Sequence, residues 1–217
     1  MSLKLYFAPG ACSFVPHSLL ELSGAAFEPV SVKLHKGEQR SAEYLALNPR
    51  GQVPVLVDDG EVITQIVAIL LHLDAKLPEA GILPAGGMAR TRALSTLAWM
   101  NNTVHPTFTH IFMPQKFTDD AAAQQVIKRF AVESYRGLLG EIEALAANAA
   151  PWLTGDRPGA LDAYALTLLR WGGIAGIDPT GFTATWALAQ RFAALPAVAT
   201  VIDRERLQLN LYQPPAG

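Results

Sequence analysis

The 217-residue sequence has a single cysteine, no long apolar run and little net charge. One cysteine cannot form a disulfide within the chain, so nothing in it requires an oxidising compartment. The formal charge of −2 argues against binding to nucleic acid or anionic membrane by bulk attraction. No stretch approaches the ~20 apolar residues that span a bilayer, and the N-terminus lacks the apolar core of a signal peptide. We therefore expect a cytoplasmic protein with a small-molecule partner and with no nucleic-acid or membrane partner.

Hydrophobic residues make up 50% of the chain, which is enough for one large core or two smaller ones. In the first third of the chain, short runs with strand character alternate with helical ones. An Asp-Gly pair at 59–60 predicts a tight turn between two antiparallel strands. The predicted order is β-α-β-(α)-β-β-α, with strands at 3–7, 27–34, 53–59 and 61–63 and helices at 14–22 and 66–77.

Residues 78–87 are rich in proline and glycine and have little periodicity, which is typical of a linker between domains. The sequence therefore predicts a first domain at 1–77 and a second at 88–217. Alanine and leucine with helical spacing dominate the second domain, so we expect it to be all α. Its predicted helices are at 88–112, 121–147, 160–172 and 183–195.

The only cysteine lies in the segment PGACSFVPH, where a Pro-Gly turn leads Cys12 to the start of a predicted helix. Unpaired backbone N–H groups and the positive end of the helix dipole favour a thiolate there, so the pKa of Cys12 is expected to fall. The alternative is a small buried hydrophobic residue without chemistry. Spacing alone leaves both open.

Val53-Pro54 is the second local feature, because proline cannot donate to a strand ladder and marks a break in pairing. If the bond is cis, the backbone of Val53 turns toward a groove where a peptide-like ligand could pair. An ordinary proline at a strand start is the alternative.

Four segments together resemble a known family: PGACSFVPH, LALNPRGQVPVLVDDG, TQIVAIL and WMNNTVHPTF. Their order and approximate spacing are similar to those of the cytosolic glutathione transferases, and the first and last segments are most like the bacterial beta class. The resemblance covers nearly the whole chain. It implies a thioredoxin-like N-terminal domain, an all-α C-terminal domain and a homodimer. Glutathione is the implied co-substrate, and the scattered histidines give no reason to expect a metal.

The resemblance also implies roles for individual residues. Cys12 matches the cysteine that contacts the glutathione sulfur and can form a mixed disulfide with it. Val53 is expected to pair its backbone with the cysteinyl unit of glutathione, with Pro54 as the family's cis-proline. His105 matches a histidine near the glutathione sulfur. Asn101 is four residues before His105, on the same helix face, and is the weaker match.

The ends of glutathione have their own expected partners. Gln65 matches the residue that meets the γ-glutamyl ammonium, and Lys36, or His35 beside it, lies near the place of the lysine that binds the glycyl carboxylate. Ile66 stands where the family usually has serine or another small residue against the γ-glutamyl carboxylate. A hydrogen bond to a charged group is worth about 1.5–3 kcal/mol, so glutathione binding about ten- to a hundred-fold weaker is implied unless another donor substitutes.

Three further residues have mainly structural interpretations. Ser13 could donate to the thiolate or cap the helix that follows it. Tyr6 corresponds to the catalytic tyrosine of other classes, but it is expected here in the core. Asp162 is interpreted as a folding residue, with Gly159 in place of the capping serine or threonine of the family.

The function implied is conjugation of reduced glutathione to small hydrophobic electrophiles bound in a pocket of the second domain. Three alternatives stay open. The chain could be a thiol transferase or disulfide reductase that uses Cys12, a glutathione-dependent isomerase or dehalogenase, or a non-enzymatic binding protein of the same fold.

Overall fold

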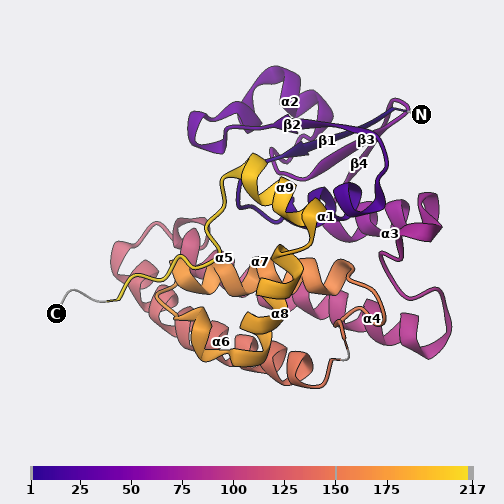
Figure 1. Ribbon diagram of the computed structural model, residues 1–217. Coiled ribbons are helices and arrows are strands. Elements are labelled where there is room, and N and C mark those ends of the chain that lie inside the picture. The colour runs from indigo at the N-terminus through magenta and orange to yellow at the C-terminus, as the bar shows by residue number, and fades with distance from the viewer. Residues whose placement is uncertain (1, 150, 215–217) are drawn as a thin grey trace.

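The computed structural model describes residues 2–149 and 151–214, which form a sheet-containing part and a helical part (Figure 1). The strand order of the sheet is β2-β1-β3-β4. β1 pairs in parallel with β2 and antiparallel with β3, and β4 is antiparallel to β3. The strands are β1 (Leu3–Phe7), β2 (Phe27–Ser31), β3 (Val55–Asp58) and β4 (Glu61–Thr64). The fold class and element order predicted from the sequence are confirmed.

Helices cover both faces of this sheet (Figure 1). Because side chains alternate along a strand, Leu3, Leu5 and Phe7 join the main core with α1 and α3, whereas Tyr6 faces α2 on the other side. Tyr44 of α2 packs edge-on against Tyr6, with ring centres 5.9 Å apart. The helices are α1 (Phe14–Ser23), α2 (Ala42–Leu47) and α3 (Ile66–Lys76).

The predicted hairpin turn is present, since Asp59 and Gly60 have φ values of 46° and 94°. The predicted strand at 27–34 is too long. It ends at Ser31, and the chain continues into two 3-10 helices, Leu34–Lys36 and Glu38–Arg40.

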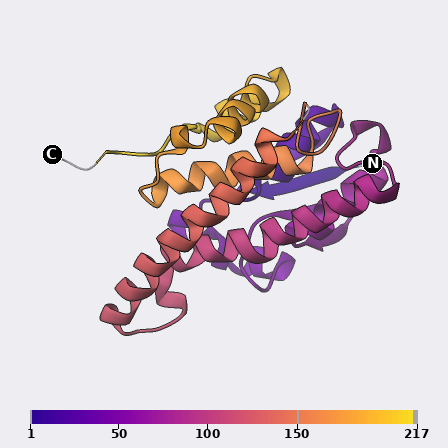
Figure 2. The same ribbon diagram turned by 90° about the horizontal axis from the view of Figure 1, so that it is seen from below.

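The second part is helical, and Figure 2, seen from below, shows its long helices in front of the sheet. α6 has the predicted bounds, and α8 packs against α6 and α7. The helices are α4 (Gly87–Trp99), α5 (His105–Phe112), α6 (Ala121–Ala147), α7 (Ala160–Ile174), α8 (Thr183–Ala193) and α9 (Pro196–Glu205). Among the described residues no single helix is long and apolar enough to cross a membrane; α8 and α9 pass that test only as a pair, bent by 91°.

Two features of the helical part were not predicted. α9 was missed; its buried positions are Val198, Val201 and the charged Glu205, which is its last residue. α9 packs against α1, so this helix lies against the sheet-containing part (Figure 1). The helix predicted at 88–112 is interrupted by a π-helix, Met100–Val104, directly before the segment that contains Pro106.

Asp162 in the first turn of α7 holds the loop that precedes the helix. Its buried carboxylate accepts the backbone N–H groups of Leu153 at 2.8 Å, Thr154 at 3.3 Å and Gly159 at 3.0 Å. The Thr154 hydroxyl accepts the N–H of Leu161 at 3.1 Å, and so supplies the capping oxygen that Gly159 lacks. A Cβ at Gly159 would lie 2.7 Å from the carbonyl oxygen of Ile82, which requires glycine there. The structure confirms the folding role of Asp162.

We expect Asp162→Ala to lower the free energy of unfolding by about 3–5 kcal/mol, because three buried N–H groups lose their acceptor. Urea denaturation followed by circular dichroism measures this change. Asp156→Ala is the matched control, since Asp156 lies exposed in the same loop. Its effect is expected to stay within about 0.5 kcal/mol. Equal losses in the two variants would contradict the assignment.

Candidate active site

The turn between β1 and α1 carries Cys12 and is bound by the helical part of the chain. The N–H of Gly10 donates to Oε2 of Glu205 at 2.9 Å, and its carbonyl oxygen accepts the indole N–H of Trp171 at 2.9 Å. Gly10 has φ +72°, and a Cβ there would lie 2.8 Å from a guanidinium nitrogen of Arg170. The positive φ favours glycine, whereas the guanidinium of Arg170 could move to make room for a side chain.

A buried polar network supports Glu205. Nδ1 of His17 lies 2.7 Å from Oε1 of Glu205, with both side chains fully buried, and Nη1 of Arg204 lies 2.9 Å from Nε2 of His17. Because arginine can only donate, Nε2 is the acceptor and Nδ1 carries the proton that His17 donates to Glu205. Arg204 also pairs with Glu21 at 2.9 Å. These contacts join α9 to α1 and aim a carboxylate at the turn before Cys12.

The Cys12 thiol is partly exposed and donates to the carbonyl oxygen of Val53, with sulfur and oxygen 3.7 Å apart. Burial raises the pKa of Cys12 to about 12, although the backbone N–H groups of Cys12 and Ser13 act in the opposite direction. The expected fall in the pKa of Cys12 is therefore wrong. The N-terminus of α1 does supply donors to the sulfur, but the loss of water around a thiolate outweighs them.

Ser13 has neither of the roles considered from the sequence. Its side chain is fully buried and makes no cap for α1. Its hydroxyl accepts the N–H of Ala8 at 3.0 Å and donates to the carbonyl oxygen of Ala8 at 3.2 Å. Ser13 therefore closes the turn that carries Cys12.

The Val53-Pro54 bond is cis, and the segment before it is held from α2. The carbonyl oxygen of Gln52 accepts the hydroxyl of Tyr44 at 2.8 Å and the side-chain amide of Asn48 at 2.8 Å. Val53 is partly exposed next to Cys12, whereas Pro54 is buried. The structure thus brings Cys12 and the Val53 backbone together.

The residues predicted to bind the ends of glutathione occupy different environments. Gln65 is exposed at the start of α3 and has a positive φ of 73°, whereas Ile66 is buried in the main core. The backbone N–H groups of the first turn of α3 have no acceptor within the helix. Lys36 and His35 are exposed in the 3-10 helix Leu34–Lys36.

His105 begins α5, where its ring contacts two residues of α7. Nδ1 lies 2.8 Å from the hydroxyl oxygen of Tyr164, and that hydroxyl donates to Oδ1 of Asn101 at 3.3 Å. The ring of Trp171 lies 4.8 Å from the imidazole, between centres. Burial lowers the pKa of His105 to about 4, so the imidazole is neutral at pH 7.

The Tyr164 hydroxyl beside His105 is buried. Burial raises the pKa of Tyr164 well above its ordinary value, and the negative charge of a Cys12 thiolate raises it further. His105, Tyr164 and Asn101 thus form one hydrogen-bonded group, and Trp171 connects it to Gly10 in the turn before Cys12. No cluster of three or more metal-binding side chains occurs among the described residues.

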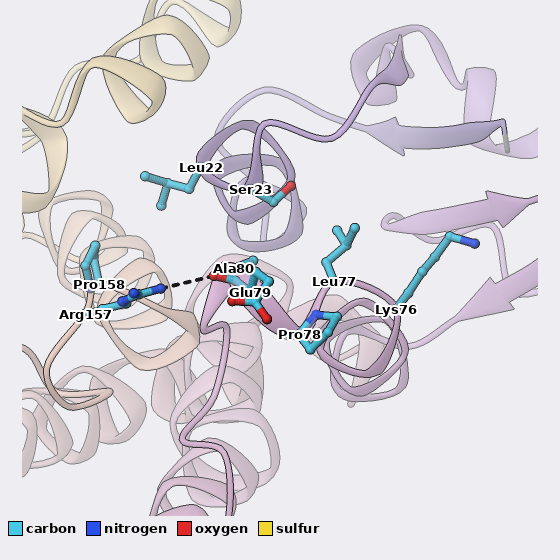
Figure 3. Close-up of a pocket in the computed structure, with 9 residues that line it drawn as sticks. All are labelled: Leu22, Ser23, Lys76, Leu77, Pro78, Glu79, Ala80, Arg157 and Pro158. Atoms are coloured by element: carbon cyan, nitrogen blue, oxygen red, sulfur yellow. Dashed lines mark hydrogen bonds between the residues drawn. The ribbon is translucent and has the colours of Figure 1, made fainter.

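A separate cavity of about 520 Å³ lies between the two parts of the molecule (Figure 3). Leu22 and Ser23 line it from the end of α1 opposite to Cys12, so it is distinct from the site. A guanidinium nitrogen of Arg157 donates across it to the carbonyl oxygen of Glu79 at 3.1 Å. The other lining residues are Lys76, Leu77, Pro78, Ala80 and Pro158.

Known proteins resemble this chain over nearly its whole length. A family model described as glutathione S-transferase, N-terminal domain, matches residues 1–75. The glutathione S-transferase GST-4.5 of Xanthomonas campestris pv. campestris is 36% identical over 94% of this chain and 100% of that protein.

Two solved structures have the same architecture. A glutathione transferase homologue from Sulfitobacter with bound glutathione has a TM-score of 0.88 and 25% identity, covering 95% of this chain and 99% of that one. The bacterial beta class glutathione S-transferase of Sphingomonas chungbukensis has a TM-score of 0.80 and 30% identity, covering 94% and 100%.

We expect alkylation of Cys12 to be slow at pH 7.5 and to accelerate about a thousand-fold by pH 10.5, because a thiol of pKa about 12 stays mostly protonated throughout. Iodoacetamide labelling followed by intact mass measures the rate, and the single cysteine makes the assignment unambiguous. Urea-unfolded protein is the control, with an expected rise of only about tenfold for a pKa near 8.5. A plateau below pH 9 in the folded protein would show that burial does not control this thiol.

Proposed function

This chain belongs to the glutathione S-transferase family, and we propose that it conjugates reduced glutathione to small hydrophobic electrophiles. One observation carries the proposal: the Cys12 thiol contacts the Val53 backbone beside a cis-proline, and Trp171 connects the turn before Cys12 to the neutral His105. The exposed backbone of Val53 is suited to pairing with a peptide-like ligand.

The proposed glutathione site uses the segment that leads into β3 and the start of α3. Val53 pairs with the cysteinyl unit, and the first N–H groups of α3 receive the γ-glutamyl carboxylate, where the helix dipole favours negative charge. The exposed Gln65 accepts from the γ-glutamyl ammonium, and Lys36 approaches the glycyl carboxylate. Ile66 adds no hydroxyl, so the backbone groups of α3 are the donors at that end.

In the proposed reaction, the sulfur of glutathione is the nucleophile. The glutathione thiol gives its proton to His105, the sulfur forms a bond to an electrophilic carbon, and the leaving group departs with the bonding electron pair. The thiolate formed in this buried site itself raises the pKa of His105, because opposite charges stabilise each other there. Full ionisation of a thiol of pKa about 8.5 raises the thiolate concentration only ~30-fold at pH 7, so positioning supplies the rest of the rate.

A second candidate is thiol transfer through Cys12, favoured by the 3.7 Å contact between its sulfur and the carbonyl oxygen of Val53. In that reaction the Cys12 thiolate attacks a glutathione disulfide, a mixed disulfide forms and one glutathione thiolate leaves. A second glutathione then restores Cys12. The raised pKa of Cys12 makes this thiolate scarce at neutral pH, which favours conjugation as the main activity.

Calorimetry with reduced glutathione and turnover of an aryl halide such as 1-chloro-2,4-dinitrobenzene test the proposal. We expect Cys12→Ala to retain conjugation within about tenfold, because glutathione carries the nucleophile, and to lose any mixed disulfide seen by intact mass. Complete loss of conjugation in Cys12→Ala with glutathione binding intact would assign the chemistry to Cys12. No heat at millimolar glutathione would leave only the hypothesis of a non-enzymatic binding protein. Glutathione binding without aryl halide turnover would point to an isomerase or dehalogenase.

We also propose a homodimer, since the family is generally dimeric. Light scattering on the purified chain, with a monomer mass of 23.3 kDa, distinguishes the two states.

A further inference from the structure

The tautomer of His105 follows from the groups that hydrogen-bond around it. The side-chain N–H of Asn101 donates to Oδ1 of Asn102 at 2.8 Å, so the oxygen of the Asn101 amide is the atom that faces Tyr164. The Tyr164 hydroxyl has a single proton, which it donates to that oxygen. Toward His105 the same hydroxyl can therefore only accept.

The Tyr164 oxygen accepts at 2.8 Å from Nδ1 of His105, so the imidazole proton is on Nδ1. Because burial keeps the imidazole neutral, there is no second proton, and Nε2 has a lone pair. Among the described residues Nε2 has no hydrogen-bond partner, and it is not one of the buried unpaired atoms, so it is accessible from solvent. Trp171 contacts the imidazole and donates to the carbonyl oxygen of Gly10, two residues before Cys12.

We propose that Tyr164, oriented by Asn101, is a positioning residue that holds His105 with its proton on Nδ1 and thereby makes Nε2 the base for the glutathione thiol. This inference rests on the proposed function. In the opposite tautomer, Nε2–H is a donor and cannot take a proton. Asn101 then acts through Tyr164 rather than only as a glutathione contact.

The two titratable neighbours of His105 do not interfere with a test of this arrangement. Tyr164 on α7 and Cys12 before α1 both have raised pKa values, with that of Cys12 at about 12. Both stay neutral below pH 9, so a pH dependence in that range reports on glutathione and its base.

Tyr164→Phe removes the acceptor for Nδ1 without changing the ring. We expect kcat/KM for glutathione with an aryl halide to fall about tenfold at pH 6.5, with the calorimetric affinity for glutathione unchanged. The deficit is expected to vanish above pH 9.5, where free glutathione is largely ionised and needs no base. In Asn101→Ala the Tyr164 hydroxyl loses its acceptor, so it can turn to donate to Nδ1 of His105. That reverses the tautomer, and we expect the same pH-dependent deficit in kcat/KM.

Tyr135→Phe is the matched control. Tyr135 is equally buried, and its hydroxyl donates to the carbonyl oxygen of Leu168 at 2.7 Å, with no hydrogen bond to His105. We expect Tyr135→Phe to cost stability but to retain the wild-type pH profile. A pH-independent loss in Tyr164→Phe, or the same profile in both variants, would overturn the proposal.

Nitrogen NMR of the wild-type protein with ¹⁵N-labelled histidine reads the tautomer directly, even if a variant fails to fold. The expected spectrum has a protonated Nδ1 and an unprotonated Nε2 for His105, identified by the signal lost in His105→Gln. A protonated Nε2 would overturn the inference. If the wild type neither binds nor conjugates glutathione, the proposed function fails instead, and the NMR result still decides the tautomer.

Discussion

The geometry of the site depends on how the helical part binds one glycine of the sheet-containing part. Glu205 and Trp171 hold the N–H and the carbonyl oxygen of Gly10, and this turn leads directly to Cys12. The same Trp171 ring contacts His105, so one residue of α7 touches both the turn before Cys12 and the imidazole. Behind Glu205, the neutral His17 satisfies the buried carboxylate, which would otherwise be costly to keep out of water.

Burial shifts the pKa values of the Cys12 thiol and the His105 imidazole in opposite directions, and both shifts favour the neutral form. It raises the pKa of Cys12 and lowers that of His105, so both groups are neutral at pH 7. A neutral thiol is a poor nucleophile, and a neutral imidazole has a free lone pair that becomes a stronger base when a thiolate forms beside it. This combination agrees with a reaction in which the thiolate comes from a bound ligand and the protein supplies the base.

The elements were largely predictable because their patterns are local. α6 repeats its apolar positions over many turns, and the Asp59-Gly60 pair supports only a tight turn. α9 was not predicted, and its buried face carries a charged residue that only tertiary contacts stabilise. The inner face of α9 includes the charged Glu205, which becomes tolerable only when His17 and Gly10 meet it.

The sequence by itself determined the order of the elements, the family resemblance and the candidates Cys12, Val53, Pro54, His105 and Asn101, because each lies in a short segment with its own pattern. Glu205, Trp171 and Tyr164 had no such signal. Gly10 is separated by 195 residues from Glu205 and by 161 from Trp171, and such contacts exist only after the two parts have packed. Tertiary structure also decided the protonation of the site. The position of Cys12 at a helix N-terminus is visible in the sequence and favours a thiolate. The exclusion of water around Cys12 depends on the atoms packed against it, which only the fold decides. Here desolvation has the larger effect on the pKa of Cys12.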